Sequence, residues 1–398
     1  MPIYLDHAAT TPLRREALEA MLPYLGEQFG NPSSPHAYGR RARAALDEAH
    51  ERVARAIGAA PREIVITSGG TEALNLAIKG GAWARKAQGP RIITTAIEHH
   101  AILHPLQQLA KFGFEIVELP VDRYGRLDPD VLGAALTDRT IIVAIGHANN
   151  EVGTVQDLAT LIARVRSDGP RGCLVAVDAV ASAPYLALDV AALDCDLLAI
   201  AAHKFDGPKG AGALYLRAGT HILGQMQGGS QERFRRAGTE DVAAAVGMGV
   251  ALSLAVDERD VVAARLTTAR DRLIAALTAI DGVELSGHPT DRLPGLVSAI
   301  ARDVEGASVV LKLDLEDVAA SVGSACTTGS AEPSHVLRAL GYPDEEARGS
   351  LRLSLGRDTS NDDVEAALEI VPRILLAARD GARHAGAGWA PIETPVPG

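Results

Sequence analysis

The feature that most constrains the fold is a regular alternation of short apolar runs and helix-length segments between residues 40 and 216. Apolar residues first recur every four positions, as on the buried face of a helix, at Ala45, Ala49, Val53 and Ile57. Short β-rich runs then follow one another at 63–67, 91–95, 114–119, 140–145, 174–177, 197–200 and 212–216. Most of these runs are separated by enough residues for a helix. We therefore predict an α/β fold with a largely parallel sheet that helices cover on both faces.

The pattern changes after a long helical stretch at 242–280. The strands become fewer and more scattered, at 295–300, 318–322 and 350–354. The chain has 398 residues, enough for two domains. We predict a large α/β domain at 15–255, a smaller α+β domain formed by 1–14 with 256–384, and a loose C-terminal tail at 385–398.

Charge and hydropathy exclude several classes of protein. The net charge of -11 argues against a surface that coats nucleic acid, and the basic clusters at 40–43 and 233–236 are short, more typical of solvated helix faces. The first seven residues lack the pattern of a signal peptide. The longest uncharged run, 242–256, is too short to span a bilayer and is typical of a buried helix. We expect no membrane contact.

The three cysteines are widely spaced and form no CxxC pair, so the sequence indicates neither a disulfide framework nor a zinc site. This usage favours a reducing cytoplasm. Cys173 and Cys195 lie in apolar runs and should behave as small core residues. Cys326 lies instead in the small-residue segment 323–329, where we expect an exposed and reactive thiol.

Polar residues follow the predicted strands, where ligands bind in a doubly wound sheet. After the first strand, the glycine turn at 68–72 opens a helix; it is either a phosphate site or an ordinary capped turn. Other strand ends supply 98–100, 148–151, 177–179 and 203–204. His100 and His104 have the spacing of a metal pair, but no third ligand is placed, so we predict no metal site.

Asp178 and Lys204 form the most informative pair. Each alone is more often a surface residue, but pyridoxal 5'-phosphate needs both a lysine for its aldehyde and a carboxylate beside its ring nitrogen. The glycine turn would take its phosphate, and the flat imidazole of His99 suits stacking on its ring. Arg352, in the apolar run 350–354, could grip a substrate carboxylate or form an edge-strand ion pair.

Taken together, these motifs resemble the pyridoxal-phosphate-dependent cysteine desulfurases of the class V aminotransferase family, in the subgroup with a long loop around the catalytic cysteine. The similarity runs nearly end to end. It covers the segments 4–12, 30–34, 67–72, 98–100, 149–153, 177–179, 203–210, 231–233, 238–239, 323–326, 333–337 and 352–356.

The resemblance implies a fold-type I, aminotransferase-like homodimer and a role for each matching residue. Lys204 would be the Schiff-base lysine, Asp178 the partner of the ring nitrogen, and His99 the residue that stacks on the ring and handles protons. Cofactor contacts would also come from Asn150 at the phenolic oxygen, from Gly70, Thr71 and His203 at the phosphate, and from Thr239 of the second subunit. Arg352, helped by Asn31, would bind the substrate carboxylate, and Cys326 would be the catalytic nucleophile.

The implied activity is that of a sulfurtransferase. L-cysteine would become L-alanine, with a persulfide left on Cys326 for a sulfur-acceptor protein, such as an iron-sulfur cluster scaffold or a thiolation enzyme. Two alternatives stay open: a selenocysteine or cysteine lyase with the same cofactor, and a catalytically weakened scaffold protein. No residue indicates the acceptor or pathway, and no direct contact with nucleic acid is expected.

Two positions depart from the family pattern. Ala181 stands where the family usually has glutamine, and Ala201 where it usually has serine. Each change removes a hydrogen-bonding side chain directed at the cofactor, at a cost on the order of 1 to 3 kcal/mol of binding. We therefore expect the protein to retain its cofactor less firmly or to turn over at an altered rate.

Overall fold

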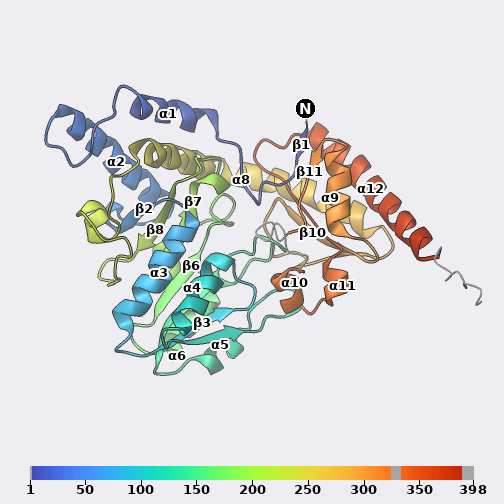
Figure 1. Cartoon of the computed structure of the whole chain (residues 1–398), viewed down its shortest axis with the longest axis horizontal. Helices are drawn as coiled ribbons and strands as arrows, with labels where there is room; N and C mark the ends of the chain where they lie inside the picture. The colour runs from blue at the N-terminus through green and yellow to red at the C-terminus, as the bar shows by residue number, and fades with distance from the viewer. Residues whose placement is uncertain (1, 324–332, 388–398) are drawn as a thin grey trace, which may run out of the picture.

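The computed structural model describes residues 2–323 and 333–387 (Figure 1). Seven strands form one sheet in the order β2-β8-β7-β6-β5-β3-β4. Neighbouring strands are parallel except at β8, which is antiparallel to both β2 and β7. The bounds are β2 (Ile64–Thr67), β3 (Arg91–Thr95), β4 (Glu115–Leu119), β5 (Thr140–Gly146), β6 (Leu174–Asp178), β7 (Leu197–Ala201) and β8 (Gly212–Leu216). The predicted mostly parallel α/β sheet is confirmed.

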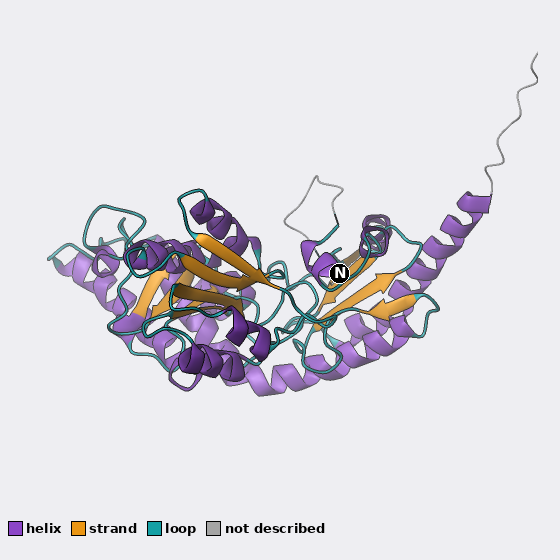
Figure 2. Ribbon diagram, turned by 90° about the horizontal axis from the view of Figure 1, so that it is seen from below, coloured by secondary structure: helices purple, strands orange, loops and turns teal. Residues whose placement is uncertain are grey.

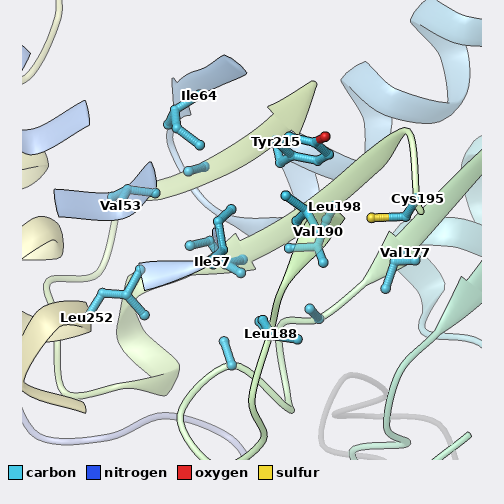
Figure 3. Close-up of a cluster of buried hydrophobic side chains, with 14 of the residues drawn as sticks. Val53, Ile57, Ile64, Val177, Leu188, Val190, Cys195, Leu198, Tyr215 and Leu252 are labelled. Atoms are coloured by element: carbon cyan, nitrogen blue, oxygen red, sulfur yellow. The ribbon is translucent and has the colours of Figure 1, made fainter. Parts of the chain in front are cut away.

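Helices cover both faces of this sheet because successive strand residues point to opposite sides. Ile64 and Ile66 pack into one apolar cluster with residues of α2 and α6, whereas Val65 packs into a second cluster with α3 and α4. Figure 3 shows part of the first cluster, in which Cys195 lies among aliphatic side chains. The helices of this region are α1 (Arg15–Leu25), α2 (Ala37–Ala56), α3 (Gly70–Arg85), α4 (His100–Ala110), α5 (Pro129–Ala135), α6 (Leu158–Asp168) and α7 (Val190–Leu193).

A second, smaller group of strands follows in the C-terminal part of the chain. β10 (Leu296–Ala301) lies between β9 (Val283–Leu285) and β12 (Ser350–Ser354) in an antiparallel sheet. β1 (Ile3–Tyr4) pairs in parallel with β11 (Val318–Ala319), so the N-terminal arm joins this region. A third apolar cluster lies in this region. The helices of the region are α9 (Gly306–Asp314), α10 (His335–Ala339), α11 (Asp344–Ala347) and α12 (Asn361–Ala387).

The long helix α8 (Val242–Thr278) connects the two regions, as Figure 2 shows. Its first half buries Met248 and Leu252 beside the seven-stranded sheet, and its second half buries Leu266 and Leu273 in the third cluster. The division at 255 and 256 stays a prediction. Of the predicted tail, 385–387 belong to α12, and 388–398 lie outside the described residues. Within 2–323 and 333–387, no helix is long and apolar enough to span a bilayer.

Candidate active site

The carboxyl ends of β3, β5, β6 and β7 meet at one edge of the sheet. β8 is antiparallel to both β7 and β2, so β2 runs in the same direction as β7. β2 therefore also ends at this edge, and α3 begins there. A cavity of about 320 Å³ lies at the edge. Most of the residues predicted to bind cofactor or substrate line it: Gly70, Thr71, His99, Asn150, Asp178, His203, Lys204 and Arg352.

Lys204 closes a short 3₁₀ turn, Ala202–Lys204, directly after β7. Its ammonium group donates hydrogen bonds to two backbone carbonyls of the N-terminal arm, at 2.5 Å to Ala8 O and 2.8 Å to Ala9 O. No sequence pattern predicts this contact, because a backbone carbonyl carries no side-chain signal. The arm therefore holds the amine at the cavity wall.

Asp178 is the last residue of β6, and its Oδ1 accepts a hydrogen bond from Val180 N–H at 2.9 Å. Burial raises the pKa of its carboxyl to about 6, although the Val180 N–H and the nearby Lys204 charge both act to lower that pKa. A cation that enters the cavity beside Asp178 would relieve this burial cost. The protonated ring nitrogen of pyridoxal phosphate is such a cation.

His99 caps the N-terminus of α4. Its Nδ1 accepts a hydrogen bond from Ala101 N–H at 3.0 Å, so the proton of the neutral ring resides on Nε2. Burial first, and then the charge of Lys204, lower the pKa of His99 to about 4. The side chain is therefore a flat, neutral imidazole at neutral pH, which suits stacking on a cationic aromatic ring.

The start of α3 is shaped for an anion. A Cβ at Gly70 would lie 2.7 Å from Val180 Cγ2 and 3.4 Å from Ala201 Cβ, so a side chain at this position would collide with the wall. The bare backbone of a helix N-terminus can thus face the cavity, as in many phosphate sites. Thr71 follows it, and His203 Nδ1 lies 3.2 Å from Thr10 Oγ1. The cavity therefore fits pyridoxal phosphate: it combines this anion site with the Asp178 carboxylate, the Lys204 amine and the flat ring of His99.

The two neighbouring asparagines after β5 have different tasks. The side-chain amide of Asn149 hydrogen-bonds to the backbone. Nδ2 donates to Ile97 O at 2.9 Å, and Oδ1 accepts from Glu151 N–H and Val152 N–H, both at 2.9 Å. Asn150 is half-buried and lines the main cavity. This arrangement supports the choice of Asn150 as the cofactor contact.

Arg352 lies in β12, and its side chain is 2% exposed, unlike a surface edge-strand arginine. Nη1 donates to Asn150 O and Gly323 O, both at 3.0 Å, and Nη2 donates to Asp6 Oδ1 at 2.8 Å. Its Nε is buried without a hydrogen-bond partner among the described residues. The guanidinium is thus held rigidly at the cavity wall by three acceptors.

Both departures from the family pattern lie at the cavity wall. Ala201 is the last residue of β7 and 1% exposed, and Ala181 is half-buried three residues after Asp178. Ala181 also lines a small adjoining chamber of about 30 Å³, together with His7, Tyr185 and Lys204. That volume is enough to hold a water molecule. The wall is therefore less polar here than the family pattern would make it.

Two predicted residues lie away from the cavity within this chain. Asn31 is exposed between α1 and α2, where its Oδ1 accepts Ser33 N–H at 2.9 Å, and Thr239 is exposed just before α8. Thr239 was expected to act on a second subunit. Cys326 lies outside the described residues, but Gly323, three residues before it, lines the cavity.

The remaining cysteines and the paired histidines are separate from this chemistry. Cys173 and Cys195 are buried, and burial raises the pKa of each thiol to about 12. The rings of His100 and His104 stack with their centroids 4.6 Å apart. Within the part of the chain that the structure describes, no cluster of three or more His, Cys, Asp or Glu residues could hold a metal ion.

Sequence reasoning missed two carboxylates at the cavity. Glu98 and Glu151 are 5% and 8% exposed and line it. Glu151 Oε2 accepts a hydrogen bond from Ser334 Oγ at 2.5 Å, which ties the segment before α10 to the cavity. Both lie in strand-end motifs noted in the sequence, and their burial is the property that no local pattern reports.

The chain matches the aminotransferase class-V family over residues 3–367. It is 49% identical over 378 residues to the cysteine desulfurase IscS of Dictyoglomus turgidum, covering 95% of each chain. Among solved structures, a NifS-like protein superposes with a TM-score of 0.89 at 32% identity, over 95% of this chain and 100% of that one. A structure described as SspA in complex with cysteine has a TM-score of 0.78 at 32% identity, over 88% and 98% of the two chains.

Proposed function

Because this chain belongs to the aminotransferase class-V family and is a cysteine desulfurase, we propose that the cavity at the sheet edge is its active site. Cysteine desulfurases are pyridoxal-phosphate-dependent sulfurtransferases that convert L-cysteine to L-alanine. The observation that carries the proposal is the meeting of Lys204, Asp178 and the bare N-terminus of α3 in one cavity. No single one of these features would specify the cofactor.

We propose that pyridoxal phosphate is held by a separate group at each end. Gly70, Thr71 and His203 would take the phosphate, Asp178 the ring nitrogen, and Lys204 the aldehyde carbon. His99 would cover the ring, and Asn150 would approach its phenolic oxygen. When bound, the cofactor supplies an electron sink for the pair released as the substrate's α-proton leaves.

The residues of the chain would then bind the substrate and move its protons. Arg352 would hold the carboxylate of L-cysteine, and the Lys204 amine would take the α-proton at Nζ. The neutral His99 lines the cavity with its proton on Nε2 and would be suited to protonate a departing or re-forming group. Lys204 must leave the carbonyls of Ala8 and Ala9 to do this work.

Cys326 would accept the sulfur. Its thiolate would attack the substrate sulfur, so that an S–S bond forms while the Cβ–S bond breaks; the carbon keeps that electron pair and takes up a proton. Overall, L-cysteine and the Cys326 thiol give L-alanine and a Cys326 persulfide. An acceptor protein, such as an iron-sulfur scaffold or a thiolation enzyme, would collect the sulfur in the cytoplasm.

We also propose that the chain works as a homodimer. Large apolar side chains are exposed on α1 and in the loop after it, including Leu22 (55%), Leu25 (64%) and Phe29 (73%). Phe234, 77% exposed, lies in a segment that a buried contact of Glu232 fastens to α2. A second copy would cover such side chains and would bring its Thr239 towards the phosphate end of this cavity.

The experiment is to incubate the protein with L-cysteine, with and without reductant, and to measure L-alanine together with the mass of the peptide that contains Cys326. We expect a persulfide on Cys326 in native protein, and neither persulfide nor alanine in Cys326→Ser. Alanine production that survives this substitution would favour a lyase. A purified protein that shows no cofactor absorbance, even after incubation with pyridoxal phosphate, would favour the scaffold protein.

A further inference from the structure

Glu98 is a buried carboxyl group for which the proposed mechanism has no task. It follows β3 and is 5% exposed. Its Oε1 accepts a hydrogen bond from Thr95 Oγ at 2.7 Å, and its Oε2 accepts one from Gly146 N–H at 2.9 Å. Both donors are neutral. A buried carboxylate with only neutral donors is costly to ionise, and it persists where its charge has a use.

The position of Glu98 is set by the same strand ends that position Asp178. Gly146 and Asp178 are register partners on the parallel strands β5 and β6. A Cβ on Gly146 would lie 2.8 Å from Glu98 Oε2, so the glycine leaves the space that the carboxyl fills. Glu98 and Asp178 both line the cavity, and the charge of Asp178 acts on Glu98.

Burial makes both acids hard to ionise. Burial, followed by the charge of Asp178, raises the pKa of Glu98 to about 7, against the lowering effect of its two hydrogen bonds, and burial raises that of Asp178 to about 6. Other titratable groups near the pair include Lys204, whose charge acts on Asp178, and His99, which lines the same cavity. The backbone N–H of His147 donates to Asp178 O, and His335 Nε2 lies 2.9 Å from Glu98 O. His99 and His147 have pKa values of about 4 and carry no charge near neutral pH.

We propose that Glu98 is a positioning residue that acts through Asp178: the two carboxyls form one acidic pair facing the ring nitrogen of pyridoxal phosphate, and cofactor binding displaces a proton from the pair. The inference rests on the proposed placement of the cofactor against Asp178. A cationic ring nitrogen lowers the proton affinity of both carboxyls, so the proton leaves to solvent. Cofactor binding is then linked to pH.

The linkage has a definite sign. Near pH 5.5 Glu98 is protonated in the free protein, and a protonated glutamate resembles glutamine in shape and charge. Above pH 7 it is ionised and adds a second negative charge beside the ring nitrogen. Native protein should therefore bind the cofactor more tightly as pH rises through this range, by up to about tenfold per pH unit for one displaced proton.

The test is the dissociation constant of pyridoxal phosphate between pH 5.5 and 8, measured by fluorescence without substrate. The variants are native protein and Glu98→Gln, whose amide can accept from Gly146 N–H and donate to Thr95 Oγ. We expect the two to agree within about twofold at pH 5.5 and to differ by about tenfold at pH 8. Equal pH dependence in both proteins, or a constant difference at every pH, would overturn the proposal.

Two adjacent threonines supply a matched pair of further variants. Thr95→Val removes the hydroxyl that stabilises the charged form of Glu98. The pH range over which cofactor affinity rises should therefore move to higher pH. Thr94→Val is the control, because Thr94 Oγ donates to Ala144 O at 2.9 Å and not to Glu98. If the pH range over which cofactor affinity rises moves equally in both variants, the proposed pair of Glu98 and Asp178 is contradicted. Absence of cofactor binding at every pH would instead refute the proposed function.

Discussion

Ala201→Ser would restore the hydroxyl that the family usually has at this position of the cavity wall. This substitution is the sharpest test of the proposed phosphate site. Ala201 Cβ lies 3.4 Å from the point where a Gly70 Cβ would be, so the side chain points at the N-terminus of α3. A serine hydroxyl there would donate to the cofactor phosphate. A hydrogen bond to a charged group contributes about 1.5 to 3 kcal/mol. Since about 1.4 kcal/mol is tenfold in affinity, binding should tighten by about 10- to 140-fold.

Equilibrium dialysis of the apo protein against pyridoxal phosphate would measure this change. The control is Ala202→Ser, because Ala202 lies in the core beneath the sheet and does not line the cavity. We expect the control to leave cofactor affinity unchanged and to destabilise the fold by about 1 to 3 kcal/mol, the cost of a buried hydroxyl without a partner. Ala201→Ser binding no tighter than native would refute the placement of the phosphate. Native protein that keeps its cofactor through extensive dialysis would refute the expected weak retention.

Three further predictions concern the substrate, pH and the dimer. Arg352→Lys cannot replace three guanidinium contacts, so the KM for L-cysteine should rise about tenfold or more in an alanine assay; an unchanged KM would exclude Arg352 from substrate binding. Both ring nitrogens of His50 face acceptors, as an imidazolium requires: Leu46 O lies at 2.8 Å and Glu232 Oε2 at 3.0 Å. Its pKa is raised by Glu232 despite burial, so the stabilisation is full below about pH 6.5 and is lost as pH rises through the raised value. Urea unfolding should show that His50→Gln costs about 3 kcal/mol at pH 6 and progressively less as the pH rises through the raised pKa; a cost that does not change with pH would contradict the charge on His50. Phe234→Asp should weaken the dimer in sedimentation experiments without destabilising the monomer, because Phe234 has φ of 63° and aspartate tolerates that conformation better; an unchanged dimer would place the interface elsewhere.

The regular alternation of strand and helix segments made the large sheet predictable. The C-terminal region lacks this alternation, and parts of its small sheet were not predicted. The runs at 91–95 and 212–216 coincide with β3 and β8. The first is rich in β-branched residues, the second is apolar, and all of their residues except Arg91 are buried. β9 has only three residues and was missed. The predicted strand at 318–322 shrinks to the two residues of β11, because its partner β1 supplies only two. Pairing across the fold, rather than local preference, sets these lengths.

The candidate site was predictable to the extent that its residues follow strands. Asp178, His99 and Lys204 each come at or just after a strand end, and parallel strands bring those ends together. The choice between Asn149 and Asn150 rested on resemblance alone; the physical reason is that the backbone needs the amide of Asn149. Glu98 was not predicted, because a glutamate after a strand is usually solvated; its 5% exposure and its hydrogen bonds from Thr95 Oγ and Gly146 N–H show that it is buried.

The N-terminal arm gives a physical reason for the matching segment 4–12, to which the sequence assigned no role. Asp6 holds the guanidinium of Arg352, and the carbonyls of Ala8 and Ala9 hold the ammonium of Lys204. Thr11 fastens the arm in turn, with its hydroxyl donating to His203 O and accepting from Asp206 N–H, both at 2.9 Å. One short segment therefore supplies hydrogen-bond acceptors to both cations that the reaction needs. A substrate carboxylate has to compete with Asp6 for Arg352, and Lys204 has to exchange two carbonyls for the cofactor. The arm keeps each cation aligned before ligands arrive, at the cost of contacts that binding must replace.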